Sequence, residues 1–187
     1  DLNSVAEDVK TAMAALLERG GGLFFIPDSS VNADAFNNGF AGMLPAQLKQ
    51  RLAPKTNAGH PDPVGLTKID FDHPIFELFQ RPHHGNLSHP RFQRYWEVSD
   101  SQLSRVLARF DDGRPALLER RFGNGTAIML LSAVDGKWNN LPVESGAIFV
   151  SFVHQAMRHL AVRSEGRSTF TVGEQIPVPA GQTLVGP

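Results

Sequence analysis

Apolar residues recur at helical spacing near the start of the chain. Ser4 and Glu7 match the S-x-x-E capping box that often begins a helix. The apolar positions that follow predict one buried helical face, made of Val5, Val9, Met13, Leu16 and Leu17. Gly20 ends this predicted helix, where a residue with positive φ is usually needed. The unbroken apolar run GGLFFIP (21–27) then predicts a parallel strand that is covered on both faces.

The middle of the chain is less regular. NADAFNNGF (32–40) and LPAQLKQRL (44–52) predict short helices, and LTKIDF (66–71) predicts a strand. HPIFELF (73–79) predicts another short helix, with Asp72 as its N-cap. Loops rich in proline, glycine, asparagine and histidine separate these segments.

The pattern changes to strands at Arg91. The segments 91–98, 104–110, 116–122 and 126–133 predict an antiparallel meander near residues 91–132, which ends in a buried strand. A long helix is expected at 146–162, because Ile148, Phe152, Ala156 and Leu160 share one face. The tail 164–187 has no helical period and predicts a linker or the start of a following β segment. We therefore expect one α/β domain over residues 1–163.

Composition narrows the range of functions. The chain has 187 residues, a net charge of -1 and no cysteine. A near-neutral chain is not expected to bind nucleic acid, whose binders carry a basic face. A chain without cysteine has no disulfide, no thiolate zinc site and no cysteine nucleophile. No apolar run is long enough to span a bilayer, so any contact with a membrane is expected through segments outside this chain.

Three stretches resemble the class I glutamine amidotransferase-like fold. They are LLERGGGLFFIPDSSVN (16–32), PALLERRFGNGTAIMLLSAVD (115–135) and WNNLPVESGAIFVSFVHQAMRHLA (138–161). More narrowly, they are similar to the domain found in bacterial membrane-anchored proteins of the BatA type, often beside a von Willebrand factor A domain. The resemblance implies a flavodoxin-like α/β sandwich with a mixed sheet. It also implies a periplasmic or cell-envelope location and protein partners there, but no established reaction.

A helix that opens a parallel sheet normally follows a strand. We therefore expect the chain to be part of a longer protein, whose upstream part supplies at least one neighbouring strand.

The reactive groups of active amidotransferases do not appear in this chain. The elbow that would carry a nucleophilic cysteine reads Pro27-Asp28-Ser29-Ser30. The place of the H-x-E pair reads Ser132-Ala133-Val134-Asp135. Glutamine hydrolysis by that route is excluded. The leading prediction is a catalytically inactive domain, with no catalytic residues and no cofactor, that acts as an interaction or scaffold module of a membrane-anchored envelope protein.

Two loops nevertheless follow adjacent strands, where open α/β sheets usually bind ligands. The candidate ligand-binding residues in these loops are Asp28, Ser29, Asn32, Asp135, Trp138 and Asn139. The alternative function is therefore a hydrolase or carbohydrate-binding module related to trehalose-utilisation-type proteins. The structural explanation competes with it: the first loop caps a short helix, and Trp138 packs against the end of the sheet. For Trp138 the packing explanation is favoured.

The histidines do not predict a metal site. His83, His84 and His89 lie in one loop without a recognised ligand spacing, and His60 and His73 lie upstream. His154 and His159 are five residues apart on the last helix, which is not the i, i+4 spacing that places two ligands on one face. No metal ligand is therefore predicted.

Overall fold

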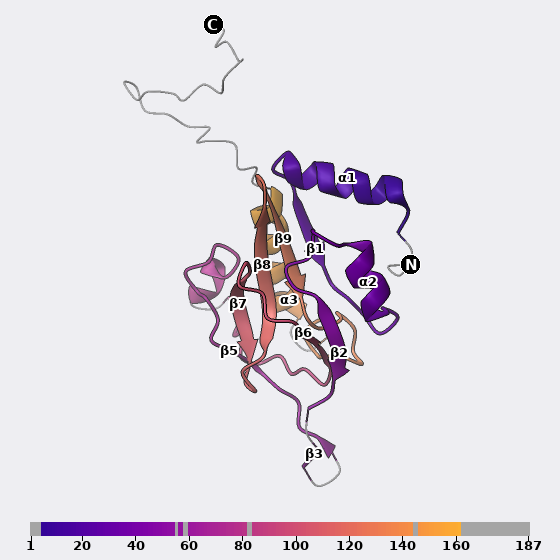
Figure 1. Cartoon of the computed structure of the whole chain (residues 1–187). Coiled ribbons are helices and arrows are strands. Elements are labelled where there is room, and N and C mark those ends of the chain that lie inside the picture. Colours follow the sequence, from indigo (N-terminus) through magenta and orange to yellow (C-terminus); the bar gives the residue numbers. More distant parts are fainter. Residues whose placement is uncertain (1–4, 55, 58–59, 82–83, 144–145, 162–187) are drawn as a thin grey trace, which may run out of the picture.

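The fold is built on a five-stranded mixed sheet (Figure 1). A computed structural model describes residues 5–54, 56–57, 60–81, 84–143 and 146–161. The strands lie in the order β1 (Gly22–Phe25), β9 (Gly125–Leu130), β8 (Pro115–Phe122), β7 (Arg105–Phe110) and β5 (Leu66–Thr67). β1 is parallel to β9, and every other neighbouring pair is antiparallel. The expected α/β class with a mixed sheet is confirmed.

The sheet separates two apolar cores. Side chains alternate between its faces, so Ile128 and Leu130 of β9 face one core while Ala127 and Met129 face the other. The first core lies under α3 (Gly146–Ala161), which contributes Phe152 among others. The second core lies under α1 (Glu7–Glu18) and α2 (Ala33–Gly39). Helices thus pack on both faces of the sheet.

Shorter elements surround the main sheet. β2 (Leu48–Leu52) pairs with β6 (Tyr95–Val98) in a separate antiparallel ribbon. β3 (Thr56–Asn57) and β4 (His60–Pro61) form a small hairpin that projects from the end of the molecule in Figure 1. A 3-10 helix, η1 (Glu77–Gln80), follows β5.

The two long helices agree with the apolar pattern to different degrees. In α3 the four residues Ile148, Phe152, Ala156 and Leu160 are all buried, as predicted. In α1 Leu17 is buried, but Val9 and Leu16 of the predicted face are exposed. The N-cap of α1 is Ala6, and the capping-box residue Ser4 lies outside the described residues. Gly20 has the expected positive φ of 86°.

Three predictions of local structure were wrong. The helix predicted at 73–79 is the shorter 3-10 helix η1, whose N-cap is Phe76 rather than Asp72. Residues 44–52 do not form a helix, because Leu48–Leu52 is the strand β2. The Asn37 side chain holds this strand in place: its Oδ1 accepts from the Leu48 N–H at 2.9 Å, and its Nδ2 donates to the Leu48 carbonyl at 2.8 Å. These contacts, together with pairing to β6, override the local preference of the sequence.

The meander is also shorter than predicted. It comprises β7, β8 and β9, whereas β6 pairs with β2 outside the main sheet. The predicted Gly123 turn is confirmed: Phe122 pairs with Gly125, and Gly123 has a φ of 58°. The tail 164–187 and the predicted boundary at residue 163 lie outside the described residues. Within the described part of the chain, the helices are too short or too polar to cross a membrane.

Candidate functional site

The loops after β1 and β9 meet at one edge of the sheet, because these two strands are parallel neighbours. The indole of Trp96, on β6, connects them. Its Nε1 donates to the Pro27 carbonyl at 3.1 Å, and its ring lies 6.1 Å from the ring of Trp138. The two loops therefore lie together at one edge of the sheet, as predicted.

The polar groups of the first loop are engaged in local turns. Asp28 Oδ1 accepts from both the backbone N–H and the hydroxyl of Ser30, each at 2.7 Å. Asn32 Oδ1 accepts from the Ala35 N–H at 3.0 Å and so caps α2. The Ser29 carbonyl accepts from Arg51 at 3.0 Å. Asp28 and Asn32 thus satisfy backbone donors, as the capping explanation proposed.

Trp138 lies in the core rather than in a pocket. Its side chain is only 1% exposed and belongs to the core under α1 and α2. Asp135 sets the turn that carries it, because Asp135 Oδ1 accepts from the backbone N–H of Lys137 at 2.8 Å and of Trp138 at 3.0 Å. The packing explanation for Trp138 is confirmed. Its Nε1 has no hydrogen-bond partner among the described residues.

Asn139 is fully buried, and both the nitrogen and the oxygen of its side-chain amide make hydrogen bonds. Its Nδ2 donates to the Ser132 hydroxyl at 2.9 Å and to the Ala133 carbonyl, and its Oδ1 accepts from the Leu141 N–H at 3.1 Å. The Ser132 hydroxyl in turn donates to the Arg94 carbonyl at 2.9 Å. In active amidotransferases the H-x-E pair would follow the strand equivalent to β9. Here the residues at that place form a hydrogen-bond network whose groups are satisfied within the chain.

Only part of the predicted ligand site borders open space. A surface groove of about 440 Å³ is lined by Ser29 and Asn32 together with Lys49, Arg51 and Trp96. Asp135, Trp138 and Asn139 do not line it. The structure therefore separates the six candidate residues into a groove-lining pair, the packed turn of Asp135, Trp138 and Asn139, and Asp28, which holds the turn at Ser30.

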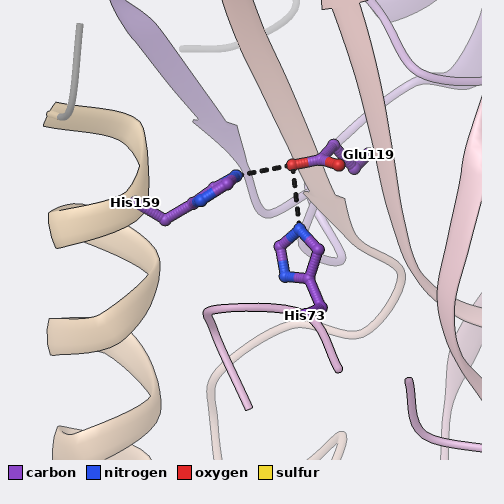
Figure 2. A group of neighbouring side chains, drawn as sticks. All are labelled: His73, Glu119 and His159. Carbon is purple, nitrogen blue, oxygen red and sulfur yellow. Dashed lines mark hydrogen bonds and ion pairs between the residues drawn. The ribbon is translucent and has the colours of Figure 1, made fainter. Parts of the chain in front are cut away.

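A second polar cluster lies on the opposite face of the sheet, under α3 (Figure 2). His73 Nε2 lies 3.3 Å from Glu119 Oε1, and His159 Nε2 lies 2.6 Å from the same oxygen. The two imidazole rings contact each other edge to face, with centroids 4.7 Å apart. The carboxylate thus receives two imidazole donors on one oxygen.

Three different elements bring this cluster together. His73 lies in the turn after β5, Glu119 lies on β8 with its side chain toward α3, and His159 lies in the last turn of α3. His73 is 2% exposed, and the side chains of Glu119 and His159 are 13% and 23% exposed. A buried carboxylate of this kind must be paired to be tolerated, and here both partners are imidazoles.

The two histidines change the acidity of Glu119. Burial alone would raise the pKa of its carboxyl group, but the hydrogen bonds from His159 and His73 outweigh burial and lower the pKa to about 2. Glu119 is therefore ionised at neutral pH.

Sequence reasoning missed this cluster because the contacts are remote. His73 and His159 lie 46 and 40 residues from Glu119. The available signal was Glu119 itself, since it follows Ala116, Leu117 and Leu118 in a strand and shares the buried side of Leu117.

Comparison with known proteins supports the fold and nothing finer. No family model and no curated protein matches the chain. Among solved structures, the chain is similar to the cytoplasmic protein STM1381 from Salmonella typhimurium LT2, with 20% identity and a TM-score of 0.62. It is also similar to the cytoplasmic protein STM3548 from Salmonella typhimurium, with 14% identity and a TM-score of 0.63. In both comparisons the match covers 84% of this chain and 62% of the other.

A third similar structure is a cold-adapted β-galactosidase from Rahnella, with 15% identity and a TM-score of 0.50. The match covers 84% of this chain but 22% of the enzyme. The chain therefore spans about three fifths of the length of the two Salmonella proteins and a smaller part of the β-galactosidase.

The comparisons contradict the predicted location. Both Salmonella structures are described as cytoplasmic proteins, which conflicts with a periplasmic or cell-envelope setting. The prediction rested on the resemblance to envelope proteins rather than on any targeting segment in the chain, and we withdraw it.

Proposed function

We propose that this chain is a catalytically inactive, class I glutamine amidotransferase-like domain that acts as an interaction or scaffold module. The flavodoxin-like architecture is part of this proposal. The main support for a catalytically inactive domain is the packed turn after β9. In this turn Trp138 and Asn139 fill the edge of the sheet where a ligand would bind. The donors and acceptors of Asn139 are used within the chain, so none of them is available to a substrate.

The hydrogen bonds of the serines in the two loops support the same proposal. A serine nucleophile needs a base within hydrogen-bond reach. Ser132, the serine at the end of β9, donates to a backbone carbonyl and accepts from an amide, and neither partner can act as a base. Ser29 contributes its backbone carbonyl to Arg51. The Ser30 hydroxyl does donate to the Asp28 carboxylate, but the same oxygen also accepts from the Ser30 backbone N–H, as in a local turn.

An activity assay tests the catalytic half of the proposal. The purified protein is incubated with glutamine, with a p-nitrophenyl ester and with a p-nitrophenyl β-galactoside, beside the variants Ser29→Ala and Asp135→Asn. We expect wild type and variants to release product at the rate of buffer alone. Turnover by the wild type that falls in either variant would contradict the proposal, because it would assign chemistry to these loops.

The outer face of α3 supports an interaction role. Val150 and Met157 are 67% and 44% exposed, and their spacing of seven places them on the same side of the helix. Val143, just before the helix, is 74% exposed. Exposed apolar side chains that gather on one helix favour contact with an apolar protein surface. The partner is therefore expected to be a protein that presents apolar side chains.

Site-specific photo-crosslinking tests this surface. A photoreactive amino acid replaces Val150, Met157 or, as the control, Asp72, which is exposed in the turn before η1. We expect positions 150 and 157 to crosslink to the same protein in the host cell and position 72 not to do so. Equal yields at all three positions would contradict a role for this helix face.

The carbohydrate-binding alternative has one supporting observation, the groove lined by Ser29 and Asn32. It lacks the aromatic platform that sugar binding uses, because Trp138 and Trp96 are both buried. Titration with trehalose, galactose and cello-oligosaccharides separates the two proposals. Saturable binding that is lost in Ser29→Ala or Asn32→Ala would favour the alternative.

A further inference from the structure

The cluster of His73, Glu119 and His159 has the composition of a metal site. In the part of the chain that the structure describes, it is the group of histidine and acidic residues whose donor atoms all lie within 4.8 Å of one another. Two histidines and one carboxylate are the ligand set of many catalytic zinc sites and of non-haem iron(II) sites. We propose that these three residues bind a single divalent transition-metal ion of this class. The proposal is independent of the proposed function.

The donor atoms can reach one ion after a small adjustment of His159. Two ligands that are each about 2.1 Å from a tetrahedral ion lie about 3.4 Å apart. His73 Nε2 and Glu119 Oε1 are 3.3 Å apart, close to that separation. His159 Nε2 and Glu119 Oε1 are 2.6 Å apart and must separate by less than about 1 Å, which an adjustment of the partly exposed His159 side chain can supply. Figure 2 shows that both imidazole nitrogens point at the same oxygen of Glu119.

A metal ion can bind only if the protons on the two Nε2 atoms move away from the cluster. Glu119 as a carboxylate can only accept, so each imidazole donates its Nε2–H to it. Nδ1 of His73 accepts from the Ile75 N–H at 3.3 Å. A metal must displace both Nε2 protons, and the proton then carried by Nδ1 of His73 replaces the contact to Ile75. Each neutral imidazole therefore keeps its proton, which moves from Nε2 to Nδ1, and metal binding loses the long hydrogen bond to Ile75.

Charged residues near the cluster affect how favourably it would bind a cation. Arg105 lies opposite Glu119 on β7, but its guanidinium is paired with Asp70. Arg121 lines the same groove and is exposed, so its charge opposes a cation at moderate range. Lys and Arg contacts to Glu119 itself are not found among the described residues, so its charge is directed at the two histidines.

The cluster also leaves room for an exchangeable ligand. It borders a surface groove of about 490 Å³ that Pro74, Leu103 and Thr126 line as well. Three protein ligands beside an open position are typical of zinc sites that keep a water molecule, whereas structural zinc sites are closed by four protein ligands. The proposed ion would therefore be bound by three side chains and reached from solvent.

Metal titration of the whole chain tests the proposal. The protein is treated with a chelator, dialysed and titrated with Zn²⁺ by calorimetry, and separately with Co²⁺ while the visible spectrum is recorded. We expect one ion per chain and the d–d absorption of cobalt in a site of low coordination number. Uptake below one ion per chain, at concentrations that saturate a three-ligand site, would overturn the proposal.

Matched variants separate this site from surface histidines. His159→Gln is expected to weaken Zn²⁺ binding at least about tenfold, as the loss of supporting groups around metals already does. His154→Gln changes the exposed histidine of the same helix and is expected to leave the affinity unchanged. Equal affinity in wild type and His159→Gln, or loss in His154→Gln alone, would show that the metal binds elsewhere and would overturn the proposal.

A second variant protects the test against misfolding. Glu119→Gln keeps the shape of the side chain but removes the charged ligand, and it too is expected to weaken binding at least about tenfold. Circular dichroism in the presence of chelator checks that each variant is folded. If Glu119→Gln is unfolded, the comparison of His159→Gln with His154→Gln decides, because His159 lies at the more exposed side of the cluster.

Discussion

The turn at Asp135–Asn139 and the cluster under α3 are two ways of burying polar groups in one sheet. The turn is built from residues close in sequence, and its buried amide is satisfied by neutral neighbours within about seven residues. The cluster joins ionisable side chains from three remote elements. The comparison teaches that a buried amide can be satisfied by local neutral partners, whereas a buried carboxylate here needs ionisable partners from remote elements.

The largest expected effect concerns Trp138. Trp138→Ala removes a fully buried ring from the core and is expected to lower the free energy of unfolding by about 4 kcal/mol. Trp138→Phe should cost less than half of that, because Nε1 has no partner to lose among the described residues. Urea unfolding measures both. The exposed neighbour Lys137→Ala is the control, and an effect of Trp138→Ala as small as that of the control would break the structural assignment of the turn.

The next effect is the dependence of stability on pH through Glu119. Its pKa in the folded protein, about 2, lies below the ordinary value of 4.5. The stabilisation is therefore fully present above about pH 4.5 and is lost as the pH falls from there towards 2. The difference of about 2.5 pKa units corresponds to about 3 kcal/mol.

Unfolding experiments in chelator at pH 7 and near pH 3 check this prediction. Wild type should lose more stability between the two pH values than Glu119→Gln, which has no carboxyl group to protonate there. Parallel losses in the two proteins would mean that the cluster contributes no proton-linked stability. His154→Gln serves again as a variant that should behave as wild type.

The smallest expected effect distinguishes charge from hydrogen bonding at Asp135. Asp135→Ala removes the acceptor for the N–H groups of Lys137 and Trp138 and should cost about 1 kcal/mol. Asp135→Asn keeps an oxygen acceptor and should cost only a few tenths of that value. If Asp135→Asn is as unstable as Asp135→Ala, the carboxylate charge has a role that the turn alone does not explain.

The sequence predicted the elements whose pattern is long and periodic. α3 and the strands β1, β8 and β9 were expected with the correct type, because each has an apolar face or run that only one regular structure can bury. Leu48–Leu52 was predicted wrongly, because Asn37 and β6 supply its hydrogen bonds from outside the segment.

The candidate sites were predictable to unequal degrees. The meeting of the loops after β1 and β9 follows from the parallel pairing of two recognisable strands. That Trp138 fills the edge could be favoured from its residue type but was decided by the packing around it. The cluster of His73, Glu119 and His159 could not be predicted from spacing. His73 is 46 residues and His159 40 residues from Glu119, and no helical or strand period relates residues so far apart.

The sequence by itself determined that the chain forms an α/β sheet with helices on both faces and that it cannot use a cysteine nucleophile. Alternation along a strand and period along a helix are local properties, and residue identity sets the available chemistry directly. Only the tertiary structure decided which polar residues are sealed in the core and which lie together at a groove. Whether a polar residue is buried or lies at a groove depends on which remote segments pack beside it. That packing is set only when the helices cover the two faces of the sheet.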